Sequence, residues 1–248
     1  MNWFRRLFTQ EETLPAIDLG EVQVDMHSHL LPGIDDGAKT LEESITLIRG
    51  FKELGYRKVI TTPHVMSDFY KNTPDIILSA KKKVKGTLAT QRVNIEVEAS
   101  AEYYLDEFLI HKIESKELLP FGDNYILFEL PFIGEPPNLA TFVFELQTNG
   151  YTPILAHPER YTYWHDNFDK YHEMKDRGVH LQLNMFSLIG YYSPQIKKIA
   201  ERMIDEGLVS FLGSDCHNEQ HLAMMDAVRT RPYLHQLVES GKLLNKTL

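Results

Sequence analysis

The stretch VQVDMHSHLLPGIDDG near the N-terminus concentrates more potential metal-binding chemistry than any other part of the chain. His27 and His29 end a β-type run, and Asp35 and Asp36 follow them in a loop bounded by glycines. Imidazole nitrogens and carboxylate oxygens are ligands of divalent transition metals. A His-x-His pair alone is common on exposed loops, so its significance depends on whether other strand ends carry similar groups.

The same residue types recur directly after the later β-type runs. These strand ends contribute His64, Glu102, Glu129, His157, Arg160, Asn184, Asp215 and His217, and His221 follows the last of them. The loops that follow parallel strands in an α/β barrel converge on one mouth of the barrel, which holds the active site. We therefore expect these side chains to surround one pocket.

Nine of these residues are candidate metal ligands, namely His27, His29, Asp36, His64, Glu102, Glu129, His157, Asp215 and His217. Each one alone is more often a loop residue than a ligand, but crowded carboxylates without metal would raise each other's pKa. Mixed imidazole and carboxylate ligands suit Mn, Fe or Zn, and this number of ligands requires two or three ions. Three ions with these carboxylates leave a charge of about +2, which matches a phosphate monoester dianion. Clustered ions also generate a hydroxide nucleophile at neutral pH, so the pattern predicts phosphomonoester hydrolysis.

Arg160 and Cys216 are the other residues with possible chemistry. Arg160 follows His157 closely, where it can make a charge-assisted contact to phosphate; a surface salt bridge with Glu159 is the alternative. Cys216 lacks the arginine six residues later that a cysteine phosphatase requires, because Leu222 stands there. The sequence also has no G-x-S-x-G elbow of a serine hydrolase. We expect Cys216 to be a small buried residue.

These residues need a scaffold of alternating strands and helices. Strands are expected at Val22–Met26, Lys58–Thr62, Asn94–Glu98, Tyr125–Glu129, Thr152–Ala156, His180–Asn184 and Val209–Gly213. Helices are expected at Leu41–Leu54, Ile76–Leu88, Asp106–Ser115, Leu139–Thr148, Phe168–Arg177, Pro194–Glu206 and Leu222–Val228. The alternation predicts parallel strands covered by helices, and seven units predict a closed or nearly closed barrel. An open doubly wound sheet is the alternative, but no G-x-G-x-x-G or P-loop sequence supports it.

Composition narrows the class of protein. The chain has 248 residues; we expect residues 1–20 to form a leader and residues 21–248 to form one barrel domain. The net charge of −9 and the lack of a basic stripe argue against nucleic-acid binding. A single cysteine indicates a reducing, cytoplasmic location, and no apolar run is long enough to span a bilayer. Residues 1–10 carry aromatic and basic side chains that can touch a membrane surface, but a frayed tail or a strip packed on the barrel is favoured.

Several stretches of the chain match the motifs of one protein family. They are DMHSHLLPGIDDGAKTLEES, TTPH, AEYY, FELP, AHPERY, the asparagine of QLN, and GSDCHN, and they span Asp25 to Asn218. In these motifs the chain resembles the PHP (polymerase and histidinol phosphatase) superfamily. Within it, the chain resembles the bacterial manganese-dependent protein-tyrosine phosphatases of capsule and exopolysaccharide loci. The resemblance implies a distorted (βα)7 TIM-like barrel of the PHP type, consistent with the seven units counted above.

The resemblance also implies how the site is organised. It assigns His27, His29, Glu102 and Asp215 to a first ion, Glu102, Glu129 and His157 to a second, and Asp36, His64 and His217 to a third. Asp35 is the less suitable member of its acidic pair. Manganese is the usual ion of this family, and Arg160 would contact the phosphate. The implied reaction is hydrolysis of phosphotyrosine on a protein, with a cognate bacterial tyrosine autokinase as the partner; no oligomeric state follows.

The chain departs from this family pattern at one place. Some of these phosphatases carry a second arginine shortly after the SD-x-HN motif, where this chain has EQHL and no arginine before Arg229. His221 is the candidate replacement, or the site is shaped for another ester.

The main alternative function is a small-molecule phosphatase such as a histidinol-phosphate phosphatase. An amidohydrolase-like barrel is a third alternative, but it would use a lysine where Glu102 stands. A non-catalytic binding module would have lost some of the metal ligands, whereas all nine are present in this chain.

Overall fold

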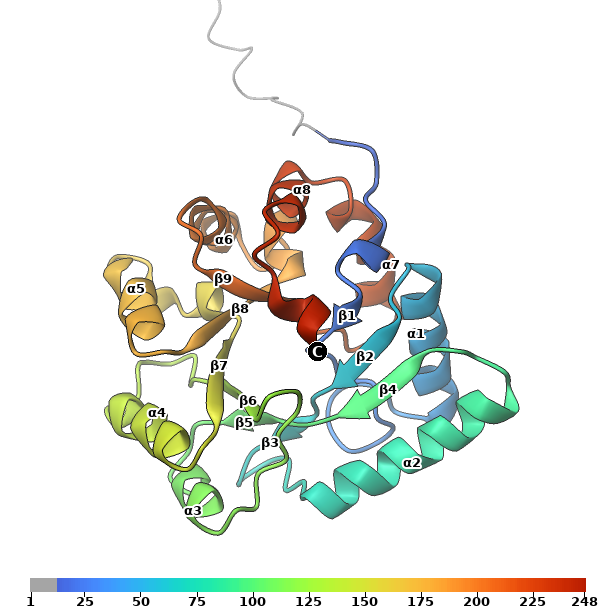
Figure 1. The fold of residues 1–248 in the computed structure, drawn as a ribbon, viewed down its shortest axis with the longest axis horizontal. Helices are drawn as coiled ribbons and strands as arrows, with labels where there is room; N and C mark the ends of the chain where they lie inside the picture. Colours follow the sequence, from blue (N-terminus) through green and yellow to red (C-terminus); the bar gives the residue numbers. More distant parts are fainter. Residues whose placement is uncertain (1–12) are drawn as a thin grey trace, which may run out of the picture.

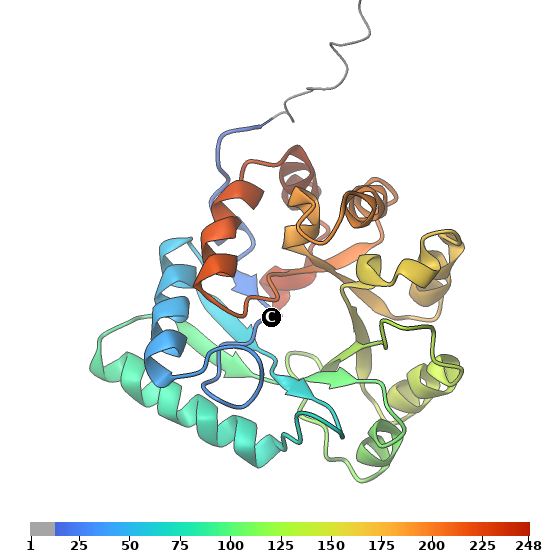
Figure 2. The same cartoon turned by 180° about the vertical axis from the view of Figure 1, so that it is seen from behind.

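A ring of parallel strands surrounded by helices forms the body of the protein (Figure 1), and the same arrangement is seen from behind in Figure 2. The computed structural model describes residues 13–248. Residues 1–10, for which a frayed tail or a packed strip was favoured over contact with a membrane, therefore lie outside the described residues. The described part of the leader packs on the barrel, since the backbone N–H groups of Leu14 and Ile17 donate to the carbonyls of Thr230 and Arg229. No helix of residues 13–248 combines the length and apolar composition needed to cross a membrane.

The strands form two parallel sheets with the orders β1-β2-β4 and β3-β5-β6-β7-β8-β9. Their bounds are β1 Val24–Asp25, β2 Lys58–Thr61, β3 His64–Val65, β4 Glu96–Ala99, β5 Glu102–Tyr104, β6 Tyr125–Glu129, β7 Thr152–Ala156, β8 His180–Asn184 and β9 Val209–Gly213. The β2/β4 and β3/β5 pairs keep one register, because Thr61 faces Ala99 and His64 faces Glu102. β2 with β3, and β4 with β5, thus form two interrupted strand positions; β3 and β5 lie beyond the expected strands Lys58–Thr62 and Asn94–Glu98 and were not predicted. Pro63 has no N–H for the ladder, which explains the first break.

Backbone hydrogen bonds between the segments that directly follow β1 and β9 close the ring. Asp215 N donates to His27 O at 2.7 Å, and His29 N donates to Cys216 O at 2.9 Å. Ser28 and Cys216 form a parallel bridge between these hydrogen bonds. The α/β barrel with seven strand positions predicted from the sequence is confirmed, and the open doubly wound sheet is not found.

The opposite end of this seam is closed by a side chain. Asn245 donates from Nδ2 to Val24 O at 2.9 Å and to Leu212 O at 2.7 Å, and its Oδ1 accepts from Leu212 N at 2.9 Å. The C-terminal end of the chain reaches the centre of the ring in Figure 1. Leu244 and Leu248 pack there on the apolar side chains that fill the barrel interior. The interior is therefore a packed core, and polar chemistry is confined to the other mouth.

The helices lie outside the ring. Their bounds are α1 Leu41–Glu53, α2 Pro74–Thr90, α3 Leu109–Glu114, α4 Leu139–Thr148, α5 Asp169–Asp176, α6 Pro194–Asp205, α7 Glu219–Val228 and α8 Pro232–Glu239. α1 starts where Thr40 Oγ1 accepts from Glu43 N, as an N-cap residue does. α3 is shorter than predicted because Asp106 Oδ1 accepts from the N–H groups of Phe108 and Leu109, which delays the helix start. α8 was not predicted.

Candidate metal centre

The structure brings all nine candidate ligands together at the C-terminal mouth of the barrel. Seven of them line a cavity of about 660 Å³, whose walls also include Arg160 and His221. His27 and His29 are fully buried beneath it. Strand ends that lie far apart in the sequence meet here because β1 is closed against β9.

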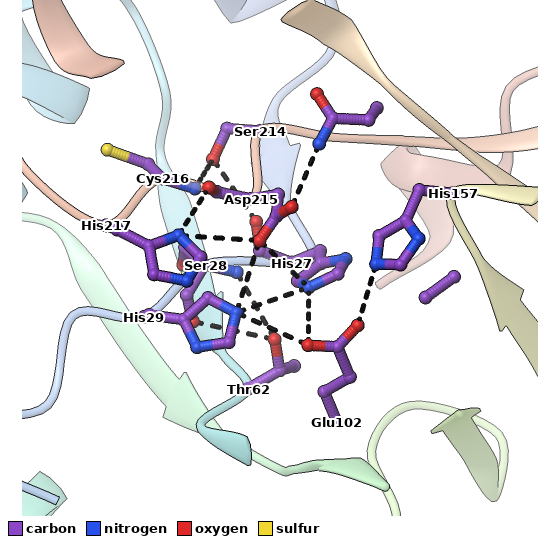
Figure 3. A network of polar contacts seen from close by, with 12 residues as sticks. His27, Ser28, His29, Thr62, Glu102, His157, Ser214, Asp215, Cys216 and His217 are labelled. Atoms are coloured by element: carbon purple, nitrogen blue, oxygen red, sulfur yellow. Dashed lines mark hydrogen bonds and ion pairs between the residues drawn. The ribbon is translucent and has the colours of Figure 1, made fainter. Parts of the chain in front are cut away.

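Four ligand atoms converge at the base of the cavity (Figure 3). Glu102 Oε2 lies 3.2 Å from His27 Nε2 and 3.5 Å from His29 Nε2. Asp215 Oδ1 lies 3.5 Å and 3.3 Å from the same two nitrogens, which are themselves 3.4 Å apart. These atoms are arranged around a common point.

The other ring nitrogens show which groups face that point. His27 Nδ1 donates to Gln182 Oε1 at 2.9 Å, and His29 Nδ1 donates to Asp35 Oδ2 at 2.7 Å. When both imidazoles are neutral, their Nε2 lone pairs face one another and the carboxylate oxygens, so every group at the centre is then an acceptor. A cation satisfies such a donor-free arrangement. The residues therefore fit a divalent metal.

The electrostatics of the cluster agree with a need for positive charge. Burial lowers the pKa of His27, but the charges of Glu102 and Asp215 outweigh burial and raise the pKa to about 9. Burial and the charge of Glu102 raise the pKa of Glu129 to about 8. In the absence of a cation, these groups would bind protons to reduce the repulsion between carboxylates. Bound divalent ions provide the same compensation without protons.

His157 and Asp215 adopt strained backbone conformations. Their φ angles are 34° and 51°, in the left-handed region that residues other than glycine rarely occupy. His157 Nε2 lies 3.0 Å from Glu102 Oε1, while its Nδ1 has no hydrogen-bond partner. Burial and the nearby Arg160 lower the pKa of His157 to about 4, so the imidazole is neutral and able to bind metal. Strain of this kind concentrates at functional sites.

A second set of ligands lies nearer the cavity opening. Asp36 Oδ1 is 3.6 Å from His64 Nε2 and 3.5 Å from His217 Nε2. His217 Nδ1 donates to Asp215 O at 2.8 Å, which directs Nε2 towards Asp36. The His29 and His217 rings stack at 4.0 Å, so this outer set continues directly from the base of the cavity.

The ligands form overlapping groups rather than three separate ones. The groups are His29, Asp36, His64 and His217; His27, His29 and Glu102; His27, His157 and Asp215; and His64, Glu102 and Glu129. Asp36, His64 and His217 stay together, as the family resemblance implies. His157 groups with His27 and Asp215, and its Nε2 also lies 3.0 Å from Glu102 Oε1 and 3.8 Å from Glu129 Oε2. Glu129 groups with His64 as well. Shared ligands of this kind suit neighbouring ions that are bridged by carboxylates.

Arg160 occupies the edge of the cluster. Its Nη1 donates to Asp215 Oδ2 at 3.0 Å, and its guanidinium lies 4.9 Å from the Phe132 ring centre and 4.2 Å from that of Tyr192. The alternative surface salt bridge with Glu159 is wrong. Glu159 is buried. Its Oε1 accepts instead from Ser187 Oγ at 2.7 Å and from Asn184 N at 3.0 Å.

His221 also faces the cavity, from the first turn of α7. Its Nδ1 accepts from His217 N at 3.3 Å, and its Nε2 lies 3.2 Å from the Tyr191 hydroxyl. Asn184, another predicted strand-end residue, donates from Nδ2 to Asp215 Oδ2 at 3.0 Å. Cys216 is fully buried, as expected. These contacts place the predicted residues around one site.

Gln182 was not predicted as a site residue, and Asp35 was expected only as the less suitable member of its acidic pair. Both orient candidate ligands rather than adding new ones, since they accept from His27 and His29. Gly213 leaves room for Gln182, because a Cβ there would lie 2.7 Å from both Gln182 Nε2 and His27 Cβ. The available signal was a glutamine in the middle of the buried run HLQLN. A polar residue that is fully buried inside a barrel strand needs a polar partner.

The chain is similar to known proteins over nearly its whole length. The family described as "Capsular polysaccharide synthesis, CpsB/CapC" matches residues 23–231. Tyrosine-protein phosphatase YwqE of Bacillus subtilis (strain 168) is 31% identical over 196 residues, which are 79% of this chain and 77% of the relative. Putative tyrosine-protein phosphatase CapC of Staphylococcus aureus is 30% identical over 222 residues, 89% of this chain and 84% of the relative.

Solved structures agree with this relationship. A structure described among "YwqE from Bacillus subtilis and CpsB from Streptococcus pneumoniae, unique metal-dependent tyrosine phosphatases" has a TM-score of 0.76 and 28% identity, covering 90% of this chain and 94% of the other. Histidinol phosphate phosphatase from Lactococcus lactis has a TM-score of 0.56 and 12% identity, covering 89% and 94%. The second likeness concerns the fold alone.

Proposed function

This chain belongs to the CpsB/CapC family of capsular polysaccharide synthesis, and we propose that it is a metal-dependent phosphatase that hydrolyses phosphotyrosine in proteins. The observation that carries the proposal is the donor-free cluster around His27, His29, Glu102 and Asp215, with Arg160 at its edge. Divalent ions, when bound there, supply an activated water and positive charge for the phosphate.

We assign the nine clustered side chains to metal binding and Arg160 to the phosphate. The guanidinium is held between two aromatic rings, so it offers its remaining N–H groups at a defined place beside the cluster. His221 is a second, weaker candidate for the phosphate, because it lines the same cavity where some relatives of the resembled family have arginine. Gln182 and Asp35 hold the imidazoles of His27 and His29 in the orientation that binding requires.

We also propose the identity of the ion, the partner and the cellular location, on the basis of the ligand types, the family resemblance and the cysteine content. The imidazole and carboxylate ligands suit Mn, Fe or Zn, and the family resemblance favours three Mn ions. The partner is a phosphotyrosine protein, namely a bacterial tyrosine kinase of capsule or exopolysaccharide synthesis. The lone cysteine favours a cytoplasmic location. Residues 21–248 act as one phosphatase domain that follows a leader of residues 1–20.

The proposal is tested with the full chain purified without chelator. Bound metals are counted, and hydrolysis of a phosphotyrosyl peptide, phenyl phosphate and histidinol phosphate is measured with added Mn, Fe or Zn. We expect turnover of the phosphotyrosyl peptide that EDTA abolishes and Mn restores. A protein that loads no metal, or that hydrolyses no phosphoester in a chelator-sensitive manner, contradicts the proposal. A marked preference for histidinol phosphate would support the small-molecule alternative, which now rests only on a shared fold.

A further inference from the structure

Two loops at the mouth of the cavity repeat the same arrangement. The loop between β3 and α2 places Tyr70 in the cavity wall and leaves Phe69 76% exposed. The loop between β6 and α4 places Phe132 in the same wall and leaves Ile133 98% exposed. Each loop thus presents one aromatic ring to the site and one neighbouring apolar side chain to solvent. We call Phe69 and Ile133 the apolar rim.

The β3–α2 loop is held in place on both sides of Phe69. Met66 N donates to Tyr70 O at 2.9 Å, which closes the loop on itself. Asn72 Nδ2 donates to His64 O at 2.8 Å, and the Tyr70 ring stacks on His64 with ring centres 5.6 Å apart. The exposed phenylalanine therefore sits on a loop that is tied to a candidate metal ligand.

The β6–α4 loop is held in a similar way around Ile133. The Tyr163 hydroxyl donates to Pro131 O at 3.1 Å, and Trp164 Nε1 donates to Glu135 Oε2 at 2.7 Å. Phe132 stacks on His157 with ring centres 5.9 Å apart. Both ends of the exposed segment are therefore fixed, although the side chain at its tip, Ile133, stays exposed to solvent.

Two pinned apolar side chains beside an active site indicate binding. Large apolar side chains held in water gain free energy when another surface covers them. Because the loops are already ordered, covering them costs little conformational entropy. β3 and β6 are separated by β5 alone, which places the two loops roughly 10 Å apart. An extended peptide covers that distance in about three residues.

We propose that the apolar rim of Phe69 and Ile133 binds apolar side chains on either side of the phosphotyrosine in an extended polypeptide substrate. This inference rests on the proposed function. Tyr70 and Phe132 both line the cavity, so the polypeptide on either side of a phosphotyrosine whose phosphate reaches the cluster lies beside the rim. A small ester fits within the cavity and leaves the rim uncovered. Apolar contacts also compensate for the repulsion between a protein of net charge −9 and an anionic phosphopeptide.

The experiment compares two phosphotyrosyl peptides and phenyl phosphate at saturating Mn. One peptide carries two leucines on each side of the phosphotyrosine, and the other carries serines there. The variants are Phe69→Ser, Ile133→Ser and the double variant. The matched control is Phe144→Ser, which removes an exposed aromatic ring of α4 that lies outside the cavity wall.

We expect the wild-type protein to favour the leucine peptide roughly tenfold in kcat/KM. Each single rim variant should lose part of this preference and the double variant nearly all of it. Phenyl phosphate hydrolysis should stay unchanged in all variants, and Phe144→Ser should keep the preference. The inference is overturned if the preference survives the double variant, or if phenyl phosphate and peptide activities fall in parallel.

A binding measurement separates this inference from the proposed function. The leucine peptide is made with a non-hydrolysable phosphonate in place of the phosphate ester, and its binding is followed by fluorescence anisotropy. Rim-dependent binding by a protein that hydrolyses no phosphoester would support the rim and contradict the proposed function. Equal binding by wild-type and double-variant proteins would contradict the rim. So would sedimentation showing a dimer that the double variant loses, because a second copy would then cover Phe69 and Ile133.

Discussion

Gln182 Oε1 lies 2.9 Å from His27 Nδ1, so a glutamine within β8 determines which nitrogen of a histidine just after β1 faces the metal cluster. The amide cannot turn over freely, because Gln182 Nε2 donates to Leu183 O at 2.7 Å. The same Oε1 accepts from His157 N at 3.2 Å. One buried amide therefore orients candidate ligands from two different strands.

Gln182→Leu is expected to weaken metal binding roughly 10- to 100-fold, because His27 loses the acceptor that holds its tautomer. Metal titration of the apo protein measures this change. Gln236→Leu is the control, since Gln236 is on α8 and bonds only to a surface aspartate, Asp205. Wild-type metal affinity in Gln182→Leu would show that the amide has no orienting role.

His157→Ala and Asp215→Ala are each expected to abolish turnover by removing a metal ligand, with more than about a 100-fold loss of kcat/KM. Bound metal should fall in parallel, and added Mn should raise the melting temperature of the variants less than that of the wild type. His111→Ala serves as the control because this histidine is exposed on α3, away from the cluster. Full metal content with lost activity would instead indicate a role in the reaction beyond ligation.

Arg160→Ala is expected to raise KM roughly 10- to 100-fold and to weaken inhibition by inorganic phosphate, while metal content stays at the wild-type level. Asp215 keeps a hydrogen bond from Asn184 in this variant, so the ligand remains in position. Arg160→Lys should be intermediate, because lysine keeps the charge but loses the planar guanidinium. Loss of metal in Arg160→Ala would show that Arg160 acts through Asp215 and not on the phosphate.

Asn245→Ala is expected to lower the free energy of unfolding by about 3 kcal/mol, because it leaves buried backbone groups of Val24 and Leu212 without partners. Urea denaturation measures this loss. Asn149→Ala is the control, since Asn149 is exposed and bonds only to Glu145 O. An effect as small as that of the control would mean that the strands close without this side chain.

Much of the scaffold could be predicted because its signals are local. β6, β7, β8 and β9 have the predicted bounds, since each is a short apolar run between turn residues. The predictions failed where one side chain or one missing N–H changed the backbone pattern. The short strand β3 that follows Pro63 was not predicted, and Asp106 delays the start of α3.

The candidate ligands could also be predicted, because parallel strands deliver the residues at their C-terminal ends to one mouth. Their grouping could not. Glu129 lies 3.4 Å from His64 and 3.8 Å from His157, and this arrangement depends on strand register and side-chain rotamers, which no local pattern encodes. The same holds for the rings of Phe132 and Tyr192 around Arg160, which come from separate loops.

The sequence by itself determined which residue types stand at the strand ends, and hence the metal chemistry and the class of barrel. Only the tertiary structure decided which atoms face one another. His27 and Asp215 lie near opposite ends of the chain, and they meet because hydrogen bonds close β1 against β9. Closure brings acceptor atoms of both residues to one point, and Gln182 turns the His27 lone pair towards it. Sequence spacing records neither the closure nor the rotation, because both arise from contacts between segments that are distant along the chain.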